Sequence, residues 1–118
     1  MKKLVIYTTY NCASCKKAMK LLDEHGIRYE QKNFFAKGLS REDINKLLEF
    51  APHGFSDIIS KRSEVYLAFR SEFETMDEEE KKLFIIQHPA ILKRPLIVDE
   101  VTETLYIGYN SFDIGQIL

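Results

Sequence analysis

The sequence has little net charge and no long hydrophobic run. Its 118 residues include 17 Lys and Arg against 18 Asp and Glu, which gives a formal net charge of −1. A protein that grips nucleic acid by itself normally presents a basic face, so this balance argues against independent DNA or RNA binding. No apolar stretch reaches the roughly 18 residues of a membrane span, and the run at 4–8 is too short for a secretion signal. We therefore expect a cytoplasmic protein without a membrane partner.

Cysteine is scarce as well. The chain has two cysteines, Cys12 and Cys15, and three scattered histidines. A structural zinc site needs four ligands at suitable spacing, and no second cysteine pair is present to complete one. The sequence therefore predicts no metal and no other cofactor. In a chain without a secretion signal, a CxxC pair is more often redox-active than structural.

The two cysteines lie between an apolar, strand-like run and a helix-like segment, within YNCASC at 10–15. The first turn of a helix has unpaired N–H groups and a positive dipole end, and both favour a thiolate. Lys16 and Lys17 add positive charge nearby, so the pair is predicted to cycle between dithiol and disulfide. Because Cys12 precedes the helix, we expect it to be the more exposed, nucleophilic thiol and Cys15 the buried, resolving one.

Hydrophobic periodicity and helix-stop signals divide the chain into a βαβ opening, a run of helices and a ββα close. This order, with CxxC between the first strand and helix, predicts an α/β thioredoxin-like fold with a helical insert and a mixed four-stranded sheet. No linker, repeat or low-complexity segment interrupts it, so we expect a single domain over 1–118, with the thioredoxin-like part at about 1–39 and 93–118 and the insert at about 40–92. The expected strands span 4–8, 27–33, 95–99 and 105–108, and the expected helices begin after Cys12 and Ser40 and span 63–69, 77–87 and 112–118.

The helical insert carries two side-chain patterns. Helical spacing places Phe69 on the inward face of the helix at 63–69. In the helix at 77–87, Asp77 and Lys81 stand four residues apart, as do Glu78 and Lys82, with the acidic residue first. This order is the favourable one, so the sequence predicts two ion pairs there.

Several short motifs agree in order and spacing with those of one known family. They are Cys12-Ala13-Ser14-Cys15, Asn33-Phe34-Phe35, Leu39-Ser40, the segment from Gly54 to Ser63, His88-Pro89, the segment from Lys93 to Glu100, and Gly108-Tyr109-Asn110. On these motifs the chain resembles the family of arsenate reductase and Spx from Leu4 to Leu118.

The resemblance implies a redox-sensing transcriptional regulator that binds the C-terminal domain of the RNA polymerase α subunit and meets DNA only as part of the polymerase complex. In that family the CxxC is a thiol-stress switch whose disulfide promotes transcription, which implies the same role for Cys12 and Cys15. Gly54 and, more loosely, Arg62 match the polymerase-contact region. Arg94, beside Pro95, matches an arginine that lies near the cysteines and responds to their state.

The resemblance also implies a protease adaptor system as a partner. Spx chains run past the last helix into a basic tail that a protease recognises, whereas this sequence ends at Leu118. This departure counts against the regulator and against control by a protease.

An arsenate reductase is the alternative within the family. Those enzymes attack arsenate with one cysteine, matching Cys12, and hold the oxyanion with three arginines, of which Arg62 and Arg94 would supply two. No arginine follows Arg94, so the third permanently charged donor is missing. Cys15 also stands where those reductases usually have no second thiol. Both departures favour the regulator.

Three of these positions also have ordinary interpretations. Arg94 is compatible with a plain surface charge, and Gly54 with a turn after Pro52 that uses the freedom of glycine at positive φ. Pro95 is compatible with a trans bond at the start of a strand. The fold resemblance adds a cis Pro95 facing the cysteines as an equal alternative.

Overall fold

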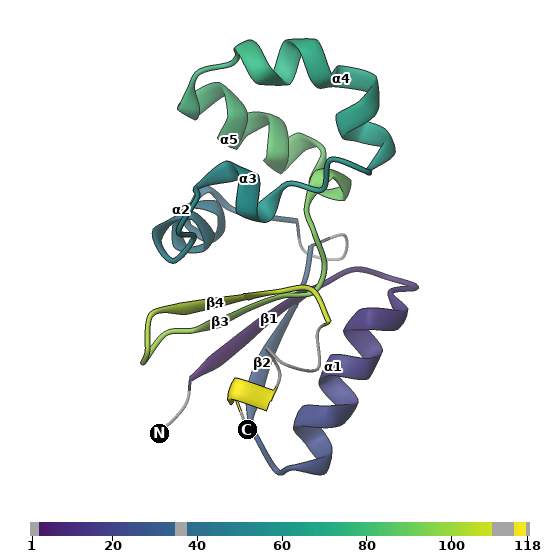
Figure 1. Cartoon of the computed structure of the whole chain (residues 1–118), viewed down its shortest axis with the longest axis vertical. Coiled ribbons are helices and arrows are strands. Elements are labelled where there is room, and N and C mark those ends of the chain that lie inside the picture. Colours follow the sequence, from purple (N-terminus) through teal and green to yellow (C-terminus); the bar gives the residue numbers. More distant parts are fainter. Residues whose placement is uncertain (1–2, 35–37, 110–114, 118) are drawn as a thin grey trace. The chain divides into compact units, whose positions relative to one another are not determined.

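The computed structural model of the chain describes residues 3–34, 38–109 and 115–117 (Figure 1). The described residues include four strands, five α-helices and one 3-10 helix, and residues 115–117 are helical as well. In chain order the elements are β1 (Leu4–Thr8), α1 (Ala13–Glu24), β2 (Tyr29–Asn33), α2 (Arg41–Glu49), α3 (Phe55–Ile58), α4 (Glu64–Thr75), α5 (Glu78–Gln87), η1 (Pro89–Ile91), β3 (Leu96–Asp99) and β4 (Thr104–Ile107).

The chain folds into two compact units. The sheet unit comprises Met1–Lys37 and Arg94–Leu118, and the helical unit comprises Gly38–Lys93. That the two units form a single domain remains a prediction.

The sheet of the sheet unit is mixed and four-stranded, in the order β2-β1-β3-β4. β1 runs parallel to β2, while the β1–β3 and β3–β4 pairs are antiparallel. The two central strands, β1 and β3, are buried along their whole length, as expected for strands whose apolar residues are continuous rather than alternating. The predicted α/β fold and mixed sheet are confirmed.

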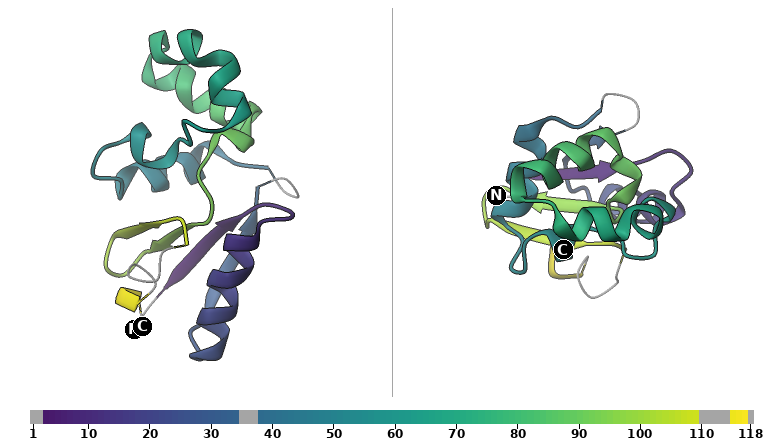
Figure 2. Two further views of the ribbon diagram at one scale, coloured as in Figure 1. Left: turned by 45° about the vertical axis from the view of Figure 1, so that its right-hand side comes forward. Right: turned by 90° about the horizontal axis from the view of Figure 1, so that it is seen from above.

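α1 packs on the sheet through one apolar stripe (Figures 1 and 2). Ala18 and Leu22 of α1 are completely buried, and they lie in one cluster with Leu4 and Ile6 of β1 and Ile97 of β3. Each buried Leu or Ile side chain contributes about 1.5–3 kcal/mol relative to an exposed one. The strand that leads into the CxxC and the helix that leaves it are therefore both fixed by the core.

Three helices of the helical unit begin at a residue whose side chain caps the helix. Ser40 caps α2 and Asp77 caps α5, each in a reciprocal capping box with the residue three positions later. Ser63 caps α4 through its Oγ, which accepts the N–H of Tyr66 at 3.1 Å. Such caps are worth about 1 kcal/mol each, because they pair N–H groups that a helix leaves open. The predicted start of α2 at Ser40 is confirmed.

α4 differs from its predicted form. It continues to Thr75, and at Phe69 the backbone leaves helical geometry (φ −118°, ψ 20°). Phe69 is 40% exposed, so its predicted inward position is wrong. Its ring lies against Phe84 and His88 of the α5 segment, with centroids 5.4 and 5.6 Å away. A helical pattern assumes an unbroken helix, and the break at Phe69 shifts its phase.

The ion pairs predicted for α5 are not formed in the part of the chain that the structure describes. Lys82 Nζ instead lies 3.5 Å from Glu79, three residues before it. Lys81 Nζ lies over the rings of Phe55 and Phe73, contributed by α3 and α4. Aromatic faces attract an ammonium group. The charge pattern within α5 could not predict this contact, because both rings belong to other helices.

The predicted closing helix at 112–118 falls partly outside the described residues, of which 115–117 are helical. Among the residues described, no helix has the length and hydropathy needed to cross a membrane.

Candidate functional site

The CxxC occupies the junction of β1 and α1. Cys12 and Cys15 form a disulfide, with Cα atoms 5.2 Å apart. Cys12 is the N-cap of α1 in an extended conformation, and its Sγ accepts the backbone N–H of Cys15 at 3.1 Å. The sulfur of Cys12 thus takes the place that a Ser or Asp oxygen has in other caps. The sequence prediction placed the pair at a helix start, and the structure does the same.

The two sulfur-bearing residues differ in exposure. Cys12 is 9% exposed and Cys15 is 1% exposed. The loop before them turns through Asn11 at positive φ (54°), and Tyr10 is 61% exposed. A thiol that attacks this disulfide therefore meets Cys12 first, and Cys15 is the sheltered partner. That Cys12 is the nucleophile remains a prediction.

The start of α1 is basic. Lys16 and Lys17 are exposed, and the first turn contains no acidic residue. The first turns of α2, α4 and α5 each contain at least one carboxylate. Acidic residues stabilise a helix N-terminus and basic ones do not, so the lysines of α1 do not serve helix stability. That their charge favours a thiolate on the reduced cysteines remains a prediction from the sequence.

Arg94 and Pro95 lie at the entrance to β3. The Arg94–Pro95 peptide bond is cis, which decides between the two isomers that the sequence left open. Pro95 is buried and Arg94 is half-buried. Arg94 Nη1 donates to Thr9 Oγ1 at 3.3 Å, and Thr9 follows β1 directly in the loop that carries the cysteines. Arg94 is therefore attached to that loop, while its role in a switch remains a prediction.

Gly54 and Arg62 belong to the helical unit, away in sequence from the cysteines. Gly54 is the N-cap of α3 at φ 63° and ψ −136°, and a Cβ placed on it would meet no atom within 4 Å. This conformation is nearly exclusive to glycine. Arg62 is exposed in the turn before α4. The structure thus leaves space beside Gly54 and exposes Arg62 to solvent. The contact of either residue with a partner remains a prediction.

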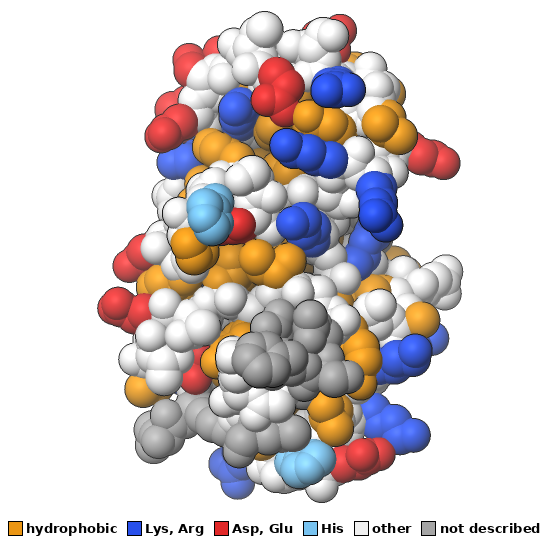
Figure 3. Space-filling model, viewed as in Figure 1, with side chains coloured by type: hydrophobic (Ala, Val, Ile, Leu, Met, Phe, Trp, Pro, Cys, Tyr) orange, Lys and Arg blue, Asp and Glu red, His pale blue; other side chains and the backbone are white. Residues whose placement is uncertain are grey.

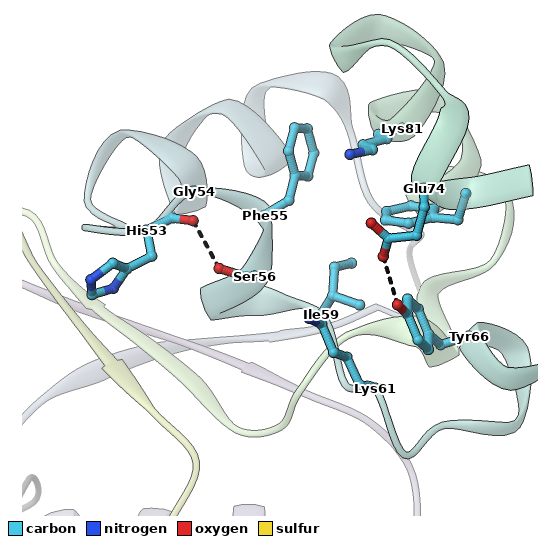
Figure 4. Close-up of a pocket in the computed structure, with 10 residues that line it drawn as sticks. His53, Gly54, Phe55, Ser56, Ile59, Lys61, Tyr66, Glu74 and Lys81 are labelled. Carbon is cyan, nitrogen blue, oxygen red and sulfur yellow. Dashed lines mark hydrogen bonds between the residues drawn. The ribbon is translucent and has the colours of Figure 1, made fainter. Parts of the chain in front are cut away.

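Lys and Arg side chains are interspersed with hydrophobic ones on the face of the helical unit seen in Figure 3. On this unit a pocket of about 350 Å³ opens between α3, α4 and α5, which we name the α3–α4–α5 pocket (Figure 4). Gly54 belongs to its lining, together with Phe55, Phe73 and Lys81. The sequence analysis named the segment from Gly54 to Ser63 but missed this pocket, because the residues that complete its lining come from α4 and α5 and no local pattern shows that these helices pack there.

The mixed four-stranded sheet with a disulfide at the β1–α1 junction defines an α/β protein of the thioredoxin-like fold. Within this fold, a family model described as the ArsC family matches residues 7–117, and the chain belongs to that family.

In the described residues, no group of three or more His, Cys, Asp or Glu side chains is placed to hold a metal ion.

Curated relatives and solved structures give two kinds of likeness. The chain is 36% identical over 115 residues to the global transcriptional regulator Spx of Bacillus subtilis, covering 98% of this chain and 86% of that protein. It is 34% identical over the same shares to the global transcriptional regulator Spx 2 of Bacillus cereus. Among solved structures, an arsenate reductase from Vibrio cholerae has a TM-score of 0.83 at 18% identity, covering 99% of this chain and 98% of that one.

These likenesses carry different weight. At 18% identity the solved structure shows the fold alone. The curated relatives are named as regulators, and together with the Cys12–Cys15 disulfide they fit a redox-sensing regulator. The names of the relatives favour a regulator over an enzyme, while the shared fold leaves the reductase alternative open.

Proposed function

We propose that this protein is a redox-sensing transcription regulator that docks on the C-terminal domain of the RNA polymerase α subunit. The observation that carries the proposal is the 36% identity to a global transcriptional regulator Spx over 98% of the chain, with a disulfide at its CxxC. The site of action is then the cytoplasm, where the polymerase works. DNA is met only as part of the polymerase complex, in keeping with a net charge of −1.

Cys12 and Cys15 form the switch in this proposal. A thiol oxidant removes two electrons and two protons from the pair as the S–S bond forms, and a dithiol reverses the step. The bond fixes the N-cap and first turn of α1, since Cys12 Sγ also accepts the N–H of Cys15. A local change of this kind needs only a small difference in free energy to bias a partner surface. Arg94 is the side chain that senses it, through its bond to Thr9.

Gly54 and Arg62 form the polymerase contact in this proposal. Open space surrounds the missing side chain of Gly54, so a partner backbone can approach closely there. A long side chain at position 54 would occupy that space. Arg62 is exposed and permanently charged, which suits it to a carboxylate on the partner.

The test is binding to the isolated C-terminal domain of the α subunit, with the cysteines reduced and with them oxidised. Gly54→Arg and Gly54→Ala form the matched pair, because both carry the same backbone strain and only arginine fills the open space. We expect binding by the wild type and by Gly54→Ala and loss of binding by Gly54→Arg. No binding in either redox state would overturn the proposal.

The reductase alternative predicts a different result. It assigns to Cys12 the attack on arsenate, and the fold shared with an arsenate reductase is the observation in its favour. Turnover of arsenate with a thiol donor, lost in Cys12→Ser, would establish it. We expect no turnover, because the sequence lacks an arginine after Arg94 to complete an oxyanion site.

A further inference from the structure

The α3–α4–α5 pocket has an apolar floor. Ile59 and Phe73 are buried at 2% exposure each, and Phe55 is half-buried beside them. Figure 4 shows the ring of Phe55 and the side chain of Lys81 turned toward one another across the opening. At about 350 Å³ the pocket lies at the small end of ligand sites and suits one large side chain.

Two lysines with no ion pair stand at this pocket. Lys81 Nζ lies 5.4 Å from the ring centroid of Phe55 and 5.3 Å from that of Phe73. Lys61 lines the same opening and is exposed. Within 3–34, 38–109 and 115–117, no carboxylate oxygen comes within ion-pair distance of either ammonium group. The aromatic rings hold Lys81 in place without neutralising it.

The nearby acidic group, Glu74, is already engaged. Its Oε1 accepts the hydroxyl of Tyr66 at 2.6 Å. That hydrogen bond lowers the pKa of Glu74 first, and Lys81, Lys61 and Arg70 lower it further against the effect of burial, so the carboxylate stays ionised. Among the residues that line the pocket, the carboxylate of Glu74 thus stands with two lysines, Lys61 and Lys81, over an apolar floor. This excess of positive charge favours a second carboxylate.

We propose that the α3–α4–α5 pocket binds a protein segment in which a carboxylate side chain neighbours an aromatic or large aliphatic one. The apolar side chain lies on Phe55 and Phe73, and the carboxylate pairs with Lys81 and Lys61. Charge complementarity selects this occupant, because a cationic or neutral segment leaves both lysines unpaired. The inference rests on the proposed function in that Gly54, the polymerase-contact position, lines the same pocket.

The first experiment uses a small probe. N-Acetyl-phenylalanine carries a phenyl ring and a carboxylate, and its amide is the same molecule without the charge. We expect the acid to give saturable NMR shifts in the amide signals of the pocket residues and the neutral amide to give much weaker ones. Equal shifts from both probes, or shifts elsewhere in the chain, would overturn the proposal.

Variants of Lys81 separate its charge from its packing. Lys81→Met keeps an apolar stem against the rings and loses the charge, whereas Lys81→Arg keeps the charge. We expect Lys81→Met to lower the affinity for N-acetyl-phenylalanine by about fivefold, which is in the range of a partly exposed ion pair. Lys81→Arg should keep the affinity of the wild type. Lys20→Met, in the sheet unit, is the control and should bind as the wild type does. Unchanged affinity in Lys81→Met would contradict the proposed pairing.

The polymerase domain then distinguishes this inference from the proposed function. If the acid binds and the α-subunit domain does not, the pocket chemistry holds and the polymerase assignment fails. If the domain binds wild type and Lys81→Met equally and the acid gives no shifts, the pocket inference fails and the function stands. Weaker binding of the domain to Lys81→Met, restored in Lys81→Arg, supports both.

Discussion

Replacing Gly54 by alanine tests whether this glycine is required for its backbone shape or for the space around it. At φ 63° and ψ −136°, Gly54 occupies a region that other residues enter only with strain. A Cβ would contact no atom within 4 Å, so no clash adds to that strain. We therefore expect Gly54→Ala to lower the free energy of unfolding by about 1–3 kcal/mol. In a chain of this length that corresponds to about 3–6 °C of melting temperature per kcal/mol.

Gly54→Arg should lose the same stability as Gly54→Ala, because the arginine side chain projects into open space. Urea unfolding followed by circular dichroism measures the free energy of unfolding of each variant. Gly115→Ala is the control of opposite sign: Gly115 is helical without a positive φ, and alanine there should stabilise by about 0.5–1 kcal/mol. The reasoning is refuted if Gly54→Ala is as stable as the wild type, or if Gly54→Arg is much less stable than Gly54→Ala.

Three further predictions follow from the two units. Limiting iodoacetamide on the reduced protein should label Cys12 before Cys15, as mass spectrometry of the peptides would show; the reverse order would contradict the assigned roles. Arg94→Ala should fold normally but abolish the difference in partner binding between reduced and oxidised protein, and an unchanged difference would remove Arg94 from the switch. Tyr66→Phe should alter the pH dependence of stability. The Tyr66 hydrogen bond lowers the pKa of Glu74, so it stabilises the fold above the ordinary value of 4.5 and less so as pH falls through the lowered pKa. The gap in urea midpoint between wild type and Tyr66→Phe should therefore narrow from pH 7 to acid pH, and a constant gap would contradict this origin.

The sheet unit could be predicted because its signals are local. The run at 4–8 is apolar at every position, and β1 spans those residues. Leu22 and Ala18 recur at helical spacing, and both are buried on α1. Asp99 illustrates what local reasoning leaves out: its carboxylate accepts the N–H of Val101 at 3.0 Å and fixes the turn between β3 and β4. The sequence placed a turn there without naming the residue that holds it.

The helical unit was predicted less well because its contacts join separate helices. The phase of α4 after Phe69 depends on a backbone break, and the position of that ring depends on Phe84 of α5. Lys81 was assigned to a neighbour on its own helix, yet the rings it meets belong to α3 and α4. A pattern of charges within one helix cannot reveal a partner that only tertiary packing supplies.

The return of the chain from the helical unit to the sheet unit explains why Arg94 is a suitable place to test coupling. Lys93 N–H donates to the carbonyl of Ile58, the last residue of α3, at 2.8 Å. The next residue, Arg94, donates to Thr9 in the loop that carries the disulfide. Lys93 thus makes its hydrogen bond within the helical unit and Arg94 makes its own within the sheet unit. A single peptide bond joins these two residues. In the proposed switch, a shift of the CxxC loop that moved Arg94 would act on the chain one residue from the bond between Lys93 and Ile58, and Gly54 is the N-cap of the helix that ends at Ile58. If the proposed switch uses this path, the effect of oxidation on partner binding should depend on the Arg94 side chain, because that side chain makes the bond to Thr9.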